Sequence, residues 1–115
     1  MQANLARVFG ERDATRRREA ITGLYVVDAP QLYEPDTSAT GRAAINQAVE
    51  ALLSSQPPDF VFTAIGPAVG HHGVARLRWQ VGPPSGPVAV TGTDVARIED
   101  GRIQTLHVFL DPPGP

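Results

Sequence analysis

The sequence predicts one α+β domain in which three N-terminal helices pack on a curved antiparallel sheet and enclose a single apolar pocket. Apolar residues recur with a helical period in the first half of the chain, whereas β-branched and aromatic residues between turn signals dominate the second half. A chain of 115 residues has the usual size of one domain and can bury one core. We expect residues 1–111 to form this domain and residues 112–115 to form a flexible tail.

Composition argues against several classes of partner. Ten basic and twelve acidic residues give a net charge of −2, which supplies no field for collecting nucleic acid or an anionic membrane. The chain contains no cysteine, so neither disulfides nor a thiolate nucleophile is available. The first residues lack the apolar run of a secretory signal, and no stretch approaches the ~20 apolar residues of a membrane span. We therefore expect a cytoplasmic protein that binds neither nucleic acid nor membranes.

Apolar spacing predicts the first two helices. The first is short and has one apolar stripe with i, i+3, i+4 spacing, made of Leu5, Val8 and Phe9. The second begins at a capping Asp13 and runs to about Leu24, because Asp is a favoured helix N-cap. The arginine run 16–18 is expected to lie on its solvated face.

The segment that follows loses the helical period. Pro30 and Pro35 divide it into short extended pieces, which we interpret as an irregular edge strand or hairpin. A third helix is predicted to start from a Thr40 cap, to present a broad apolar face, and to end before Pro57 and Pro58.

The second half predicts four antiparallel strands at about 60–69, 73–82, 88–99 and 102–110. The sequence Asp100-Gly101 is typical of a tight hairpin turn. Alternation along the strands assigns one apolar face, because successive side chains point to opposite sides. The members of this face are Ala75, Leu77, Trp79, Val81, Val90, Gly92, Asp94, Ala96, Ile98, Leu106, Val108 and Leu110. If they form one concave surface, Asp94 is the only carboxylate on it.

Three features carry a resemblance to a known family: the order of these elements, the Gly-Arg-Ala-Ala-Ile start of the third helix, and the segment 92–103. The chain resembles the nuclear transport factor 2-like superfamily, its SnoaL-like branch most closely and ketosteroid isomerase more distantly. The resemblance covers almost the whole chain. It implies a cone-shaped sheet whose open end admits a small molecule, and a homodimer formed through the sheet.

The resemblance also implies roles for two carboxylates. In the isomerases a carboxylate before a proline removes a proton, while a tyrosine and a protonated aspartate stabilise the enolate. Glu34, before Pro35, stands near the first position, and Asp94 stands at the aspartate position on the penultimate strand, where polyketide cyclases of the SnoaL-like branch have their general acid/base. Leu5 stands close to the tyrosine position. Half of the oxyanion arrangement is therefore missing, which argues against steroid isomerisation.

The chemistry of the residues leaves alternatives at both carboxylates. Beside Trp79 and Leu106, Asp94 would be desolvated, and its pKa would rise toward the range useful for proton transfer. Alternatively, it faces outward or pairs with Arg76 or Arg97. Glu34 is either a second acid/base or an exposed loop carboxylate.

The other expected pocket residues also have a structural alternative. Trp79 forms a flat wall for a ligand or fills the core, and Tyr25 orients a ligand or packs half-buried at a helix end. The full set of expected ligand-binding residues is Phe9, Tyr25, Trp79, Ala96, Leu106 and Val108. The adjacent His71 and His72 diverge in a turn with no further ligand at metal spacing, so no metal site and no cofactor are expected.

These observations favour a cofactor-independent enzyme that moves a proton on an apolar small molecule, in an isomerisation or a cyclisation. The alternative is a non-catalytic ligand-binding or dimerisation domain of the same fold. The two differ in one structural feature. An enzyme should have an open cavity with Asp94 at its wall, whereas a structural module should have that cavity plugged by Trp79 and Phe9.

Overall fold

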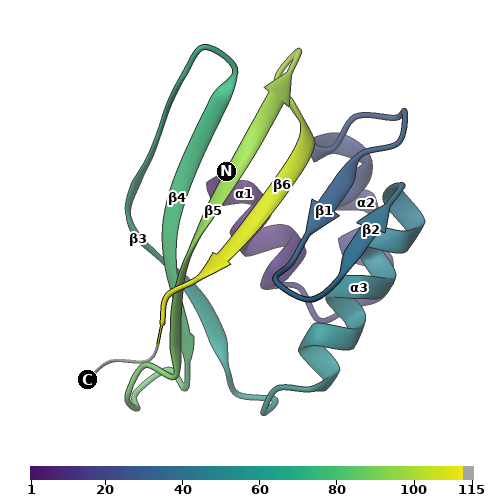
Figure 1. Ribbon diagram of the computed structural model, residues 1–115. Coiled ribbons are helices and arrows are strands. Elements are labelled where there is room, and N and C mark those ends of the chain that lie inside the picture. The colour runs from purple at the N-terminus through teal and green to yellow at the C-terminus, as the bar shows by residue number, and fades with distance from the viewer. Residues whose placement is uncertain (113–115) are drawn as a thin grey trace.

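The computed structural model describes residues 1–112, so of the predicted tail only Pro112 lies within the described part. Helices lie on one side of a single curved sheet (Figure 1). The helical segments are α1 (Gln2–Asn4), which continues into the π-helical η1 (Leu5–Phe9), α2 (Ala14–Leu24) and α3 (Arg42–Ser54). The strands are β1 (Gln31–Tyr33), β2 (Ser38–Thr40), β3 (Val61–His71), β4 (Val74–Gly82), β5 (Val90–Glu99) and β6 (Arg102–Leu110). The predicted α+β class, with three helices and a curved sheet, is confirmed.

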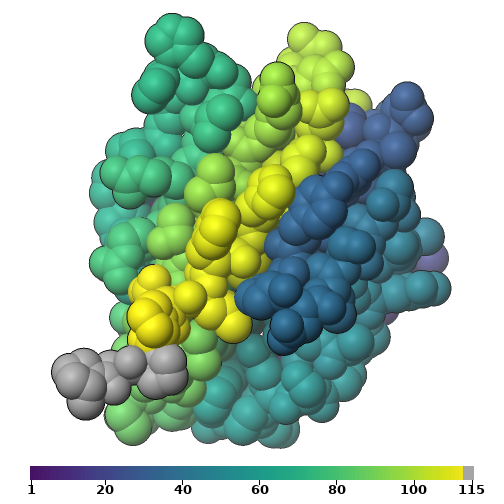
Figure 2. Space-filling model, viewed as in Figure 1, coloured from purple at the N-terminus to yellow at the C-terminus, as the bar shows by residue number. Residues whose placement is uncertain are grey.

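The sheet has the strand order β2-β1-β6-β5-β4-β3. All neighbouring strands are antiparallel except β1 and β6, which run parallel. In this order β6 lies between β1 and β5, as Figure 2 shows. The predicted edge hairpin before the third helix is formed by β1 and β2. The sheet therefore extends the predicted four-stranded meander by one hairpin.

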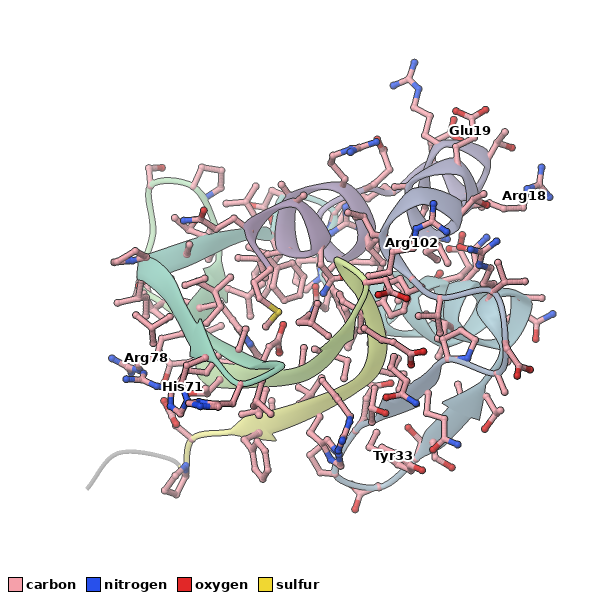
Figure 3. All side chains as sticks on the ribbon, turned by 90° about the horizontal axis from the view of Figure 1, so that it is seen from above. Arg18, Glu19, Tyr33, His71, Arg78 and Arg102 are labelled. Carbon is pink, nitrogen blue, oxygen red and sulfur yellow. The ribbon has the colours of Figure 1, made fainter. Side chains whose placement is uncertain are left out.

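Irregularities in the strands account for the curvature. The pairing of β3 with β4 shifts register between Ile65 and Val69, where Gly66 has a φ of +76°, and β5 shifts against β6 between Arg97 and Ile98. Such bulges bend a strand and increase its twist. Viewed along the molecule from above, the sheet curls into a trough, open at one side, that partly surrounds the helices (Figure 3).

Of the two predicted helix N-caps, Asp13 is confirmed and Thr40 is wrong. The carboxylate of Asp13 accepts hydrogen bonds from the backbone N–H groups of Thr15 and Arg16 at 2.9 and 3.1 Å, so it caps α2 as expected. Thr40 does not cap α3; it is the last residue of β2. The N-cap is Gly41 with a φ of +95°, a conformation that favours glycine and leaves no side chain to cap the helix.

The arginine run on α2 is not uniformly solvated, which corrects the sequence-based expectation. Arg18 points away from the body of the molecule (Figure 3), but Arg17 is completely buried. The Arg17 guanidinium donates hydrogen bonds to Asn46 Oδ1 at 2.5 Å, to the Glu11 carbonyl at 2.7 Å and to Glu50 Oε1 at 2.9 Å. Burial of a charged group is tolerated when its donors are satisfied in this way. Arg17 thus ties α2 to α3 and to the loop before α2.

Replacing Arg17 with Met is expected to lower the free energy of unfolding by about 1–2 kcal/mol, because Asn46 Oδ1 and the Glu11 carbonyl lose a charged donor. Urea denaturation measures this loss. Arg18→Met is the matched control, and as an exposed substitution it should change stability by less than about 0.5 kcal/mol. Equal effects of the two variants would contradict a specific role for the buried guanidinium.

The core lies between the concave face of the sheet and the helices. Twelve buried residues from η1, α2, α3, β1, β5, β6 and the position that follows α2 form one cluster, and a second, smaller cluster joins Leu5 to Leu77, Trp79 and Val81. Among the described residues no helix is long and apolar enough to cross a membrane. A cavity remains next to the second cluster.

Candidate functional site

A cavity of about 150 Å³ lies between η1, the end of α3 and the concave face of β4, β5 and β6. Most of its wall is apolar and includes Leu5, Phe9, Phe62, Trp79, Val81 and Val108. Three polar side chains complete the wall: Glu34, Gln56 and Asp94. The exposed rim residues Val90 and Leu110 mark where the cavity opens to solvent. The cavity is therefore an apolar chamber with few polar groups, which is typical of small-molecule sites.

Asp94 lies in the middle of β5 and is only 3% exposed. Leu77 and Val108 are its direct neighbours on β4 and β6, so the two adjacent strands enclose it on both sides. Its Oδ1 accepts a hydrogen bond from Trp79 Nε1 at 2.8 Å. Arg76 and Arg97 are exposed on the convex side. The alternative in which Asp94 faces outward to pair with an arginine is therefore wrong.

The surroundings of Asp94 raise its pKa from an ordinary 3.8 to about 6. Burial is the main cause, because desolvation disfavours the charged carboxylate. The hydrogen bond from Trp79 stabilises the carboxylate and opposes this rise, while the negative charge of Glu34 adds to it. Asp94 thus changes its protonation state near neutral pH, which is the condition for an efficient general acid or base.

The indole that holds Asp94 is itself held by a small set of contacts. The Trp79 ring packs edge-on against Phe62 with a centroid distance of 5.6 Å, and Phe62 packs against Phe9 at 6.2 Å. Gly92, opposite Trp79 on β5, leaves room for the indole: a Cβ at this position would lie 2.8 Å from Trp79 Cη2 and 2.6 Å from the Phe109 carbonyl oxygen. The absence of a side chain at Gly92 therefore permits the Trp79–Asp94 hydrogen bond.

Glu34 reaches the same cavity from the β1–β2 hairpin. Its backbone exchanges hydrogen bonds with Thr37, N–H to carbonyl oxygen, at 2.9 and 3.3 Å, which fixes the turn. The side chain is half-buried, and this burial raises its pKa, opposed by a hydrogen bond from Thr37. Glu34 is thus a partly buried carboxylate in the cavity wall and not a fully exposed loop residue.

Comparison with known proteins identifies the family of this chain. A family model described as a SnoaL-like domain matches residues 3–106. The chain belongs to the SnoaL-like family. A crystal structure of a candidate isomerase of this family from Agrobacterium tumefaciens has a TM-score of 0.87 at 28% identity, covering 96% of this chain and 93% of that one. No curated protein matches the sequence.

Two further structures share the fold. A candidate polyketide cyclase from Sinorhizobium meliloti has a TM-score of 0.67 at 20% identity, covering 91% of this chain and 93% of that one. A nuclear transport factor 2-like protein of unknown function from Exiguobacterium has a TM-score of 0.75 at 23% identity, covering 97% and 98%. These two establish the architecture, which on its own supports many unrelated functions.

The structure separates the expected pocket residues of this SnoaL-like domain into two groups. Those that line the cavity together with Asp94 and Glu34 are Phe9, Trp79 and Val108. Those that lie in the core instead, each 0% exposed and outside the cavity wall, are Tyr25, Ala96 and Leu106. Tyr25 ends α2, and Ala96 and Leu106 pack in the main core cluster together with residues of the helices. None of the three belongs to the cavity wall, so their contact with a ligand stays a prediction that this cavity does not support.

Tyr25 illustrates the difference. Its hydroxyl donates a hydrogen bond to Asn4 Oδ1 at 2.7 Å inside the core. Burial, followed by the charge of Asp94, raises the pKa of Tyr25, so the phenol stays neutral. It links α1 to the end of α2 and lies outside the cavity wall.

Sequence reasoning missed several wall residues. Phe62 shows the same strand alternation as Trp79 and could have been assigned to the concave face from Phe60, Phe62 and Ala64. Gln56 follows α3 in an irregular segment before Pro57, and no periodic signal identifies it. His71 and His72 lie at the exposed β3–β4 turn, apart from the cavity.

Proposed function

We propose that this SnoaL-like domain catalyses cofactor-independent proton transfer on a compact, largely apolar small molecule, in an isomerisation or an intramolecular cyclisation. One observation carries the proposal: an almost fully buried carboxylate, Asp94, with a pKa of about 6, stands in the wall of an open apolar cavity. A strongly perturbed carboxyl in a cleft is a physical sign of a functional group. The names of the Agrobacterium and Sinorhizobium neighbours support the same reaction classes.

In the proposed reaction Asp94 acts as both base and acid. Its carboxylate removes a proton from a carbon next to a carbonyl group, the C–H electron pair moves into the enolate, and the carboxylic acid then returns the proton to another atom of the same molecule. Trp79 holds Oδ1, so the carboxyl group is oriented and Oδ2 is left for the substrate. Leu5, Phe9 and Val108 keep water away from the enolate.

Glu34 is the second carboxylate of the proposed site. It lies in the same cavity wall, where burial raises its pKa, and it is the second group that can exchange a hydrogen bond with the substrate. Its negative charge also contributes to the raised pKa of Asp94.

The open cavity favours an enzyme or a ligand-binding domain over a purely structural module. Trp79 and Phe9 line the cavity and do not plug it, and Asp94 stands at its wall. The homodimer and the cytoplasmic location stay predictions.

Deuterium exchange tests the proposal without knowledge of the natural substrate. A panel of small cyclic ketones is incubated with the protein in D₂O, and loss of the α-proton signal is followed by ¹H NMR. We expect exchange above the buffer rate for at least one ketone, with a rate that rises with pH and is half-maximal near 6, because the ionised form of Asp94 is the base. A rate equal to buffer across the panel would favour the non-catalytic binding domain.

A further inference from the structure

We infer that Gln56 is a specificity-determining residue that selects ligands carrying a hydroxyl group or another hydrogen-bond donor. The inference rests on the proposed function only in taking the same cavity as the ligand site. It extends that function by naming a polar feature of a ligand that is otherwise apolar.

The first observation is an unsatisfied acceptor. Gln56 belongs to the cavity wall, and its Oε1 is shielded from solvent without a hydrogen-bond partner among the described residues. A buried amide oxygen without a donor costs about 1–3 kcal/mol, and native proteins rarely leave such a group unpaired. The donor must come from another group of the protein, from water or from a ligand.

No side chain of the wall supplies it in the structure. Apart from Gln56, its polar side chains are Glu34 and Asp94, which only accept hydrogen bonds when ionised, and neither is hydrogen-bonded to Gln56. The indole N–H of Trp79 is the remaining side-chain donor of the wall, and it is already used by Asp94. A ligand in the cavity can supply this donor once the Gln56 amide turns toward it.

The second observation is that the backbone of Gln56 is fixed. The Arg12 guanidinium donates to the Leu53 carbonyl at 3.2 Å and to the Pro57 carbonyl at 3.0 Å, on either side of Gln56. The Gln56 N–H also donates to the Leu53 carbonyl at 3.2 Å. The terminal torsion of glutamine is broad, so the amide can turn toward a ligand while its backbone stays in place. The backbone is therefore preorganised, and only the side-chain amide has to move to meet a ligand.

Size and polarity together define the ligand class. A dry cavity of about 150 Å³ in another protein takes up benzene, so the similar volume here suits a molecule built on one small ring. We expect this ring to present its hydroxyl group to Gln56 and its reacting carbon to Asp94.

Two matched probes test the inference. Phenol and toluene have nearly the same shape and differ in the hydroxyl group, and their dissociation constants can be measured by NMR titration. In Gln56→Met, which keeps the side-chain length but loses the amide, the ratio of the toluene to the phenol dissociation constant should fall about fivefold to tenfold, the equivalent of one hydrogen bond. Gln56→Glu keeps an acceptor oxygen and should keep at least half of the preference.

Gln47→Met is the control, because it makes the same substitution at an exposed position of α3 and should leave the ratio within about twofold. An unchanged ratio in Gln56→Met, or an equal change in Gln47→Met, would overturn the inference. Repeating the titrations in Asp94→Asn separates the role of the carboxamide from that of the carboxylate. If the Gln56→Met effect disappears there, Asp94 and not Gln56 recognises the hydroxyl; if it persists, Gln56 selects the ligand whether or not the ketone exchange supports catalysis.

Discussion

Asp94→Asn is expected to lower the rate of ketone α-proton exchange at least about 100-fold. A positioned general base contributes about 10²–10⁴-fold to proton transfer, and an amide cannot accept the proton. The new amide retains an oxygen that accepts the hydrogen bond from Trp79 Nε1, so the shape of the wall should be preserved. The measurement is the exchange rate at pH 7.5 on the ketone that the wild-type protein exchanges fastest.

Asp100→Asn provides the matched control. It makes the same chemical change in the same β5–β6 hairpin, at an exposed turn residue whose φ of +51° asparagine also adopts. The control should exchange at the wild-type rate. Loss of exchange in both variants would point to a general effect of the substitution on the hairpin, and retention of exchange in Asp94→Asn would remove Asp94 from the mechanism.

Asp94→Asn should also make the folded protein more stable at neutral pH. The pH dependence of stability explains why. Well below pH 3.8 Asp94 is neutral in the folded and the unfolded chain and contributes no pH dependence. Between pH 3.8 and about 6 the unfolded chain loses the proton first, so stability falls as pH rises. The difference between these two pKa values corresponds to about 3 kcal/mol of the free energy of unfolding, and the protein has lost all of it above pH 6–7.

Asp94→Asn removes this cost, because an amide has no charge to desolvate. Urea denaturation should show a gain of about 2–3 kcal/mol over the wild type at pH 7.5 and almost none at pH 4. A gain that is equal at both pH values would show that packing and not charge is responsible. Loss of activity together with a gain in stability is the pattern expected of a group retained for function.

The faces of the strands could be predicted from the sequence because a strand alternates its side chains with a strict period of two. This alternation correctly places Trp79 and Asp94 on the concave side. It does not show that the two side chains meet. That contact depends on the register, in which Trp79 pairs with Gly92 and lies diagonally to Asp94. The loop between β4 and β5 has no turn type that fixes this register from the sequence.

Tertiary packing decides the features that the sequence did not reveal. Ala96 and Leu106 alternate in phase with Asp94, but whether a concave residue faces a helix or a cavity depends on how η1, α2 and α3 lie on the sheet. Arg17 falls on the helical stripe with Ala20, Ile21 and Leu24, yet its charge suggested solvation. Its acceptors come from distant parts of the chain. A local sequence pattern does not reveal hydrogen-bond acceptors that come from distant parts of the chain.

Gly92→Ala is expected to lower the free energy of unfolding by about 2–3 kcal/mol and to release the indole from Asp94. The new Cβ would lie 2.6 Å from the Phe109 carbonyl oxygen, which belongs to the backbone of β6, and against the Trp79 ring. The backbone cannot yield without disturbing the pairing of Gly92 with Leu110, so the indole must move. Overpacking of this kind typically costs about 1–3 kcal/mol. Loss of the Trp79 hydrogen bond should also raise the pKa of Asp94 further, since that bond stabilises the carboxylate.

Two readouts separate this effect from a general response to alanine. Trp79 is the only tryptophan of the chain, so its fluorescence reports directly on the indole, and urea denaturation reports on stability. Gly23→Ala, in α2 with no atom near the new Cβ, should instead stabilise the protein by up to about 1 kcal/mol, because alanine favours the helix. If Gly92→Ala leaves both fluorescence and stability unchanged, the indole has room that the structure does not give it. If it moves both, the missing side chain at position 92 is what allows a tryptophan to hold the carboxylate that we propose as the catalytic group.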